Sequence, residues 1–164
     1  MNLLKSSLLA TAMLAAAPLA MAATVTAPLN VTLTLENNCV VATAPVAFGT
    51  RNTLATAIDG QGSVTVTCTS TGGSYDIAFN GGSTPTGTIT QRKLVHSGGN
   101  TINYNLYTTA GRTVVLGDGT NGVKLTGTGN GLAQVYPVFG QVAAGQDPKA
   151  VGSYSDSVTV TVSF

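Results

Sequence analysis

The sequence has little charge and few of the side chains that carry out chemistry. Charged residues make up 8% of the 164-residue chain, there are one histidine and two cysteines, and tryptophan is absent. About a quarter of the residues are charged in an average soluble domain. Nucleic acids and anionic membrane surfaces are bound by clustered Lys and Arg side chains, and Arg92-Lys93 is the one adjacent basic pair. The composition therefore argues against nucleic acid and against an anionic membrane surface as partners.

Motifs of the common hydrolases and metalloenzymes are also missing. The chain contains no Gly-x-Ser-x-Gly nucleophile motif, and its five aspartates are scattered rather than paired for acid–base catalysis. His96 precedes the polar residues 97–100, so we interpret it as a solvated loop side chain. We expect no enzyme activity, no metal site and no cofactor.

Residues 1–22 have the pattern of a secretory signal peptide. Lys5 is followed by an apolar run over residues 8–17 and by the small-x-small cleavage site Ala20-Met21-Ala22. The run is too short and too rich in alanine for a membrane anchor. Without Lys5, six basic and six acidic residues remain, so the mature chain would be formally neutral. We expect an exported protein.

The two cysteines, Cys39 and Cys68, would enter an oxidising compartment after export, where a disulfide between them is the expected state. Closing this loop is worth about 3–4 kcal/mol by the chain-entropy estimate. Free thiols and a metal pair are the alternatives. The metal pair is the weaker one, because no CxxC spacing is present and only His96 is available to complete such a site.

Apolar and polar residues alternate along the chain after residue 22, and no stretch has the 3.6-residue apolar period of a helix. Short alternating stretches separated by Gly and Asn turns predict one antiparallel β-sandwich of immunoglobulin-like type. Residues 49–62 are expected to form the longest connection, followed by residues 141–152. The expected strands are residues 63–68, 75–79, 101–106, 123–125, 135–142 and 158–164.

The longest alternating stretch is residues 24–35, which carries no charge. An apolar strand near a chain end is an aggregation hazard unless it pairs with another strand. Two interpretations remain open: an edge strand of a complete sandwich, or a donor strand that completes the sheet of a neighbour. Burying five Val or Leu side chains gives roughly 8–15 kcal/mol, comparable to the stability of a whole domain. The apolar positions are Val25, Ala27, Leu29, Val31, Leu33 and Leu35.

An ordered set of short motifs covers residues 30–164. The motifs are Cys39, Phe48-Gly49, Val64-Thr65-Val66-Thr67-Cys68, Arg92, Tyr104-Asn105-Leu106-Tyr107, Gly117-Asp118-Gly119, Val135-Tyr136, Phe139-Gly140-Gln141 and Gly152-Ser153-Tyr154-Ser155-Asp156. With this set the chain resembles the spore coat protein U-like domain family, found in archaic chaperone–usher pilus subunits of the Csu type. One departure is Leu116, where family members often have tryptophan.

The resemblance implies an incomplete immunoglobulin-like sandwich that lacks its last strand. A periplasmic chaperone lends a strand until, at an outer-membrane usher, the N-terminal segment of the next subunit replaces it. Residues 1–22 would be the signal peptide, 23–37 the donor strand and 38–164 the pilin domain. The acceptor groove would be bordered by the strand that starts near Cys39 and by the C-terminal strand, which would also bind the chaperone. The apolar positions of that C-terminal strand are Val158, Val160, Val162 and Phe164.

The function that the resemblance implies is structural. Copies of the chain would polymerise into the shaft of a surface pilus for attachment and biofilm formation. The partners would be other copies of the same subunit, the periplasmic chaperone, the outer-membrane usher, and minor and tip subunits. The alternative is a complete, secreted β-sandwich that forms a coat layer or binds carbohydrate.

Overall fold

The computed structural model describes residues 23–164, so the predicted signal peptide lies outside the described residues. Residues 23–38 form no helix or strand. The chain divides after Thr34 into two units, and all nine strands of the described residues belong to the second unit, Leu35–Phe164. The strands are β1 (Cys39–Ala44), β2 (Ile58–Cys68), β3 (Thr71–Phe79), β4 (Arg92–His96), β5 (Thr101–Tyr107), β6 (Leu125–Asn130), β7 (Gln134–Val142), β8 (Tyr154–Ser155) and β9 (Val160–Ser163).

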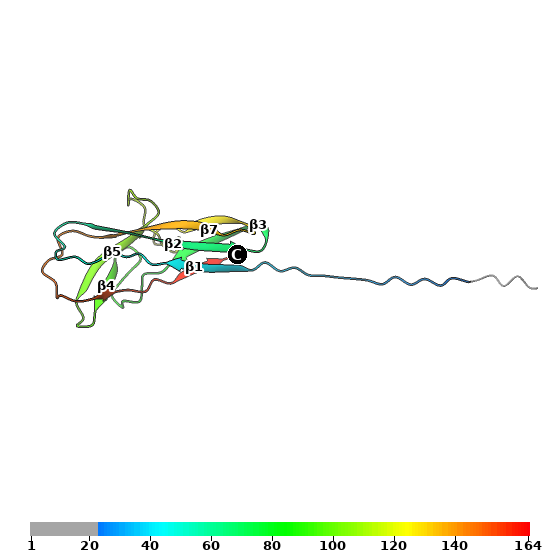
Figure 1. Ribbon diagram of the computed structural model, residues 1–164, viewed down its shortest axis with the longest axis horizontal. Coiled ribbons are helices and arrows are strands. Elements are labelled where there is room, and N and C mark those ends of the chain that lie inside the picture. Colours follow the sequence, from blue (N-terminus) through cyan, green and yellow to red (C-terminus); the bar gives the residue numbers. More distant parts are fainter. Residues whose placement is uncertain (1–22) are drawn as a thin grey trace, which may run out of the picture. The chain divides into compact units, whose positions relative to one another are not determined.

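The strands form two sheets whose paired strands are antiparallel. The larger sheet has the order β1-β2-β7-β5-β4-β8, and the smaller one has the order β6-β3-β9. Both sheets are visible in Figure 1, where β2 and β7 run side by side through the larger one. The all-β, immunoglobulin-like sandwich predicted from the alternating pattern is confirmed.

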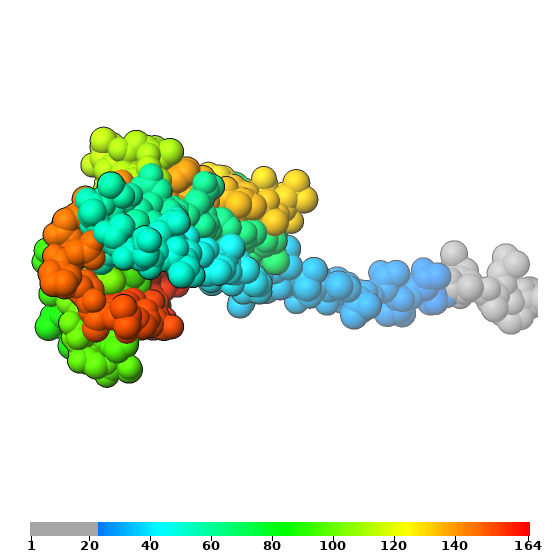
Figure 2. Space-filling view, turned by 60° about the vertical axis from the view of Figure 1, so that its left-hand side comes forward, coloured from blue at the N-terminus to red at the C-terminus, as the bar shows by residue number. Residues whose placement is uncertain are grey.

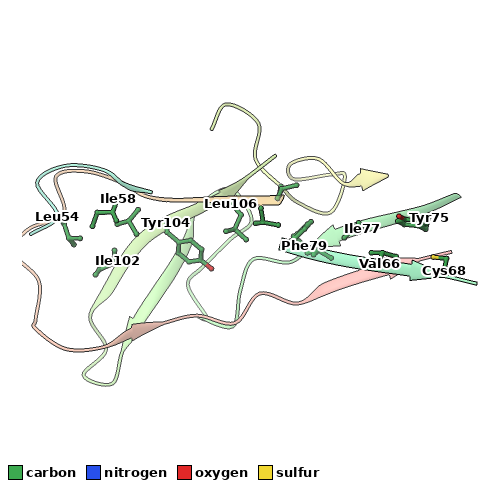
Figure 3. Packing of buried hydrophobic residues seen from close by; sticks show 14 residues of the cluster. Leu54, Ile58, Val66, Cys68, Tyr75, Ile77, Phe79, Ile102, Tyr104 and Leu106 are labelled. Atoms are coloured by element: carbon green, nitrogen blue, oxygen red, sulfur yellow. The ribbon is translucent and has the colours of Figure 1, made fainter. Parts of the chain in front are cut away.

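The core forms where the alternating apolar residues of the two sheets face each other. In β2, Val64, Val66 and Cys68 are buried, whereas the threonines between them are partly exposed. The cluster runs the length of the sandwich, from Leu54 and Ile58 at one end to Tyr75 and Cys68 at the other (Figure 3). Leu116 is fully buried and packs in the core of the sandwich.

Strand β2 begins at Ile58, which corrects the prediction that residues 49–62 form one long connection. The prediction failed because Gly60 and Gly62 read as turn residues. In the structure the chain that follows β1 crosses closely over the sheet at these glycines. A Cβ atom added at Gly62 would lie 2.5 Å from the carbonyl oxygen of Ala44, and one added at Gly140 would lie 2.5 Å from Cγ1 of Val46. Glycine therefore serves a close approach here.

Strands β4 and β8 were not predicted, and the interpretation of His96 as a solvated loop residue was wrong. His96 ends β4, is half-buried and pairs with Tyr154 of β8. The two rings lie 5.3 Å apart between centroids. Neither strand could be predicted from alternation of apolar and polar residues. The buried residue at the start of β4 is the charged Arg92, and β8 has only two residues.

The predicted disulfide is present. Cys39 and Cys68 lie opposite each other in the ladder between β1 and β2, and their sulfur atoms are bonded. The bond ties the first residue of the edge strand β1 to the last residue of β2. Residue 39 is therefore held covalently to the core of the sandwich, directly after the irregular segment 35–38.

Candidate functional site

The sandwich is open along one side. Strand β1 is one edge of the larger sheet, and β9 is one edge of the smaller sheet. A groove of about 340 Å³ opens between residues 43–48 on one wall and residues 156–160 on the other. Figure 2 shows the cyan segment that follows β1 beside the orange segment that leads to β9, with part of the green interior visible between them. The floor is made of Val64, Phe79, Leu94, Tyr104, Leu106 and Val138.

A second, wider hollow of about 660 Å³ continues the groove. It lies between residues 46–54 and residues 147–156. Val46, Phe48, Leu94 and Asp156 line both hollows, so together they form one opening along the side of the sandwich. The rings of Phe48 and Tyr104 meet edge to face in this floor, with centroids 6.0 Å apart.

The predicted acceptor strand forms one wall of the groove. Val160 and Val162 lie opposite Phe79 and Ile77 of β3, and both are half-buried against the core. Val158 lines the groove just before β9 begins, whereas Phe164 follows the strand and is 56% exposed. Because β9 has a sheet neighbour on one side only, the backbone N–H and C=O groups of its other edge are free to pair with an added strand.

The predicted donor residues form no strand. Their large apolar side chains are between 85% and 94% exposed. A single extended segment has no neighbour to complete its backbone hydrogen bonds, so it is not stable as a strand by itself. Pairing of this segment with a groove stays a prediction. The exposed side chains are those of Val25, Leu29, Val31, Leu33 and Leu35, and the small Ala27 between them is exposed as well.

Asp156 fixes the chain where it crosses from β8 in one sheet to β9 in the other. Its Oδ1 atom accepts hydrogen bonds from the backbone N–H and the hydroxyl of Ser83, at 2.8 and 2.9 Å. Its Oδ2 atom accepts a hydrogen bond of 2.7 Å from the Tyr104 hydroxyl. Burial and this hydrogen bond to a carboxylate raise the pKa of Tyr104 well above its ordinary value, so Tyr104 remains a donor.

Arg92 is a buried cation behind the same wall, with no carboxylate among its hydrogen-bond partners. Its Nε and Nη2 atoms donate to the carbonyl oxygen of Asn80 at 2.9 and 2.7 Å. Burial lowers the pKa of Arg92 from its usual value. Further donations reach the carbonyl oxygens of Ile89 and Leu116 at 3.0 Å each and Oδ1 of Asn105 at 2.6 Å.

Sequence reasoning predicted the apolar C-terminal strand but not the polar residues behind the groove wall. In the sequence, Arg92 and Asp156 stand out only as parts of the motif set. An arginine next to a lysine predicts a surface position, and nothing in the local pattern indicates that Arg92 is buried. Asp156 likewise gains its role from Ser83 and Tyr104, which are far away in the sequence.

The structure is an open β-sandwich in which the edge strand β9 has a neighbour on one side only, and sequence comparison adds the family. Residues 25–161 match the model of the Spore Coat Protein U domain, and the chain belongs to this family. Among solved structures, the chain is similar to one from the chaperone–tip adhesin complex of CFA/I fimbriae biogenesis, at 17% identity and a TM-score of 0.47. That match covers 74% of this chain and 40% of the other. No curated protein matches the sequence.

Within residues 23–164, no three His, Cys, Asp or Glu side chains lie close enough together to hold a metal ion. The same residues contain no helix with the length and apolar character needed to cross a membrane.

Proposed function

We propose that this protein is the shaft subunit of a chaperone–usher pilus and that it polymerises by donor-strand complementation. Residues 24–35 of one copy would lie in the groove of the next copy, beside β9. The observation that carries this proposal is an open apolar groove beside an unpaired edge strand, in a chain that also carries an alternating, charge-free segment. Membership of the Spore Coat Protein U domain family supports it.

The length and the apolar face of residues 24–35 fit the groove. An extended segment over residues 24–35 spans about 40 Å, enough to follow the whole side of a sandwich. Its apolar face would cover groove residues that are only partly buried, such as Phe48 and Leu94, while its threonine-rich face would meet solvent. Removing those apolar side chains from water supplies the driving force for joining.

The other partners follow from the same groove. Before assembly, an exposed groove of this kind would aggregate, so a periplasmic chaperone would cover β9 and an outer-membrane usher would exchange it for the next subunit. The assembled fibre would reach the cell surface, where it would serve attachment and biofilm formation together with minor and tip subunits.

Electrophoresis without boiling tests the proposal on the exported protein. A donor-strand polymer runs as a ladder that heat converts to monomer, because the copies are held by backbone pairing and apolar burial without covalent bonds. A chain lacking residues 24–35 should still be exported with its chaperone but should give no ladder. A ladder from that truncated chain, or an unheated monomer from the intact one, would contradict the proposal, and the latter would favour a closed, secreted module.

A pair of point variants sharpens this test. Leu33→Asp places a charge on the face expected to be buried, where an unpaired carboxylate costs several kcal/mol. Thr32→Asp adds the same charge to the opposite face, where it stays in water. We expect the ladder to be lost in the first variant and kept in the second. Equal ladders from both variants would show that residue 33 is not buried between subunits.

A further inference from the structure

Asn80, the residue that follows β3, binds Thr159, the residue that precedes β9. The backbone N–H of Asn80 donates to the carbonyl oxygen of Thr159 at 3.1 Å. In return, the N–H of Thr159 donates to Oδ1 of Asn80 at 2.8 Å. Thr159 lies between Val158 and Val160, both of which line the groove. The position of Asn80 therefore decides where this wall of the groove begins.

Asn80 is in turn held by the guanidinium of Arg92. Two of the N–H groups of Arg92 converge on the Asn80 carbonyl oxygen, and Nη2, which supplies one of them, also lies 3.4 Å from the carbonyl oxygen of Phe79. The remaining donors reach the Leu116 carbonyl, the Ile89 carbonyl and the Asn105 side chain. Asn105 belongs to β5 of the larger sheet, whereas Phe79 belongs to β3 of the smaller one. Arg92 thus connects the two sheets.

We propose that Arg92 is a positioning residue of the acceptor groove. By holding Asn80, it keeps the start of β9 at the distance from the opposite wall that an incoming strand requires, before any strand has arrived. The proposal rests on the proposed function, because it assigns Arg92 to the site that receives the donor strand.

The geometry of the groove explains why such a residue is needed. Strand β9 has four residues and one neighbouring strand, so β3 is its only support within the sheet. The planar guanidinium offers five N–H donors in a fixed arrangement, whereas a lysine ammonium offers three on a flexible stem. Arg92→Lys keeps the charge but cannot reach the acceptors of β3, β5 and the Leu116 segment together.

Binding of a synthetic donor strand measures the state of the groove directly. The host is the full exported chain carrying Leu33→Asp, so that its own segment does not occupy a groove, and the probe is a fluorescent peptide with the unaltered sequence of residues 24–35. We expect Arg92→Lys to weaken peptide binding about tenfold, the order expected for lost hydrogen bonds to a charged group. Asn80→Ala should weaken it similarly, and the two changes together should weaken it by less than the product of the single effects.

A matched control separates positioning from general stability. Tyr75→Phe removes the 2.7 Å hydrogen bond to the Tyr136 hydroxyl in the middle of β3, away from Asn80. This variant should unfold more readily in urea but bind the peptide as the host does. The proposal is overturned if Arg92→Lys binds the peptide normally, or if Tyr75→Phe loses affinity to the same degree at equal loss of stability.

If Arg92→Lys does not fold, Asn80→Ala tests the next contact instead. It keeps the backbone carbonyl that Arg92 binds but removes the Oδ1 atom that accepts the Thr159 N–H, so unchanged peptide affinity overturns the proposal and a loss near tenfold supports it. If the host itself does not bind the peptide although it is folded, the proposed function fails first, and Arg92 has no acceptor site to position.

Discussion

At the scale of single residues, three glycines allow the wall of the groove to exist. Gly60, Gly62 and Gly140 lie where the chain after β1 crosses the larger sheet, and backbone or side-chain atoms of that chain occupy the space a Cβ atom would need. Without a side chain at these positions, Val46 and Phe48 reach the floor of the groove. The glycines therefore shape the site without lining it.

Gly62→Ala should lower the free energy of unfolding by about 2 kcal/mol, as is typical of overpacking. The added Cβ atom would lie 2.5 Å from the Ala44 carbonyl oxygen, and a backbone atom has little freedom to move away. Urea unfolding measures the change. Gly111→Ala is the control, because the nearest atom is the Thr109 hydroxyl oxygen at 3.7 Å, and it should change stability by less than about 0.5 kcal/mol. Equal stability of the two variants would contradict the close crossing.

Residue identity alone predicted the core well and the special positions poorly. The buried positions of β2 and β3 follow from alternation, since every second side chain of a strand in this sandwich faces the same interior. Gly62 and Arg92 misled for a common reason. A glycine predicts a turn, and an arginine predicts a surface position. In the structure, segments that are distant in the sequence pass close to Gly62 and bury Arg92, and no local pattern indicates either.

At the scale of elements, β1 is held in its sheet less firmly than the inner strands are, so it depends on the disulfide. It is an edge strand, five of its six residues are exposed, and it pairs with β2 alone. The bond between Cys39 and Cys68 closes a loop with a sequence separation of 29. A cross-link of that span limits the unfolded chain and stabilises the folded one.

Replacing both cysteines by alanine should lower the free energy of unfolding by about 3 kcal/mol. Urea unfolding of the intact and substituted chains measures the loss, and adding a reductant should bring the intact chain close to the substituted one. The substituted chain serves as its own control, because the reductant should leave it unchanged. If reduction leaves the midpoint of the intact chain unaltered, the bond does not contribute in this way.

Of the two walls of the groove, the sequence predicts the one formed by β9 better than the other. Strand β9 was expected because Val158, Val160 and Val162 alternate with polar residues, and the structure places all three against the core or the groove. The other wall, residues 43–48, consists of the end of β1 and the irregular chain after it, and was not expected as a whole. Its course depends on the glycines of β2 and β7 beneath it, which no local pattern connects to it.

At the scale of the whole molecule, the low charge becomes informative. The groove floor is mainly apolar, Asp156 is the one charged residue among the described residues that line the groove, and the predicted donor segment carries no charge. The two salt bridges of the described residues, Arg112–Asp59 and Lys124–Asp76, lie outside the groove. Joining of subunits should therefore depend on burial of apolar surface and on backbone pairing, neither of which is screened by salt.

The temperature at which the unboiled ladder dissociates should consequently be almost the same at about 0.05 M and about 1 M NaCl, because screening weakens only interactions between charges. Gel electrophoresis after a temperature series at both salt concentrations measures it. A fall of more than about 10 °C at high salt, where exposed ion pairs are screened, would mean that charged contacts hold the subunits together.

The place of Cys39 has a mechanical consequence. In a fibre built as proposed, tension reaches each sandwich through residues 36–38 and arrives at the first residue of β1. An edge strand pulled from its end would peel away one hydrogen bond at a time, which is the weakest way to load a ladder. The covalent bond to Cys68 passes the load at once to β2, which pairs with β7 over nine residue positions. The force is then shared across many bonds as shear, so a stretched fibre should yield at the joints between subunits before any subunit unravels.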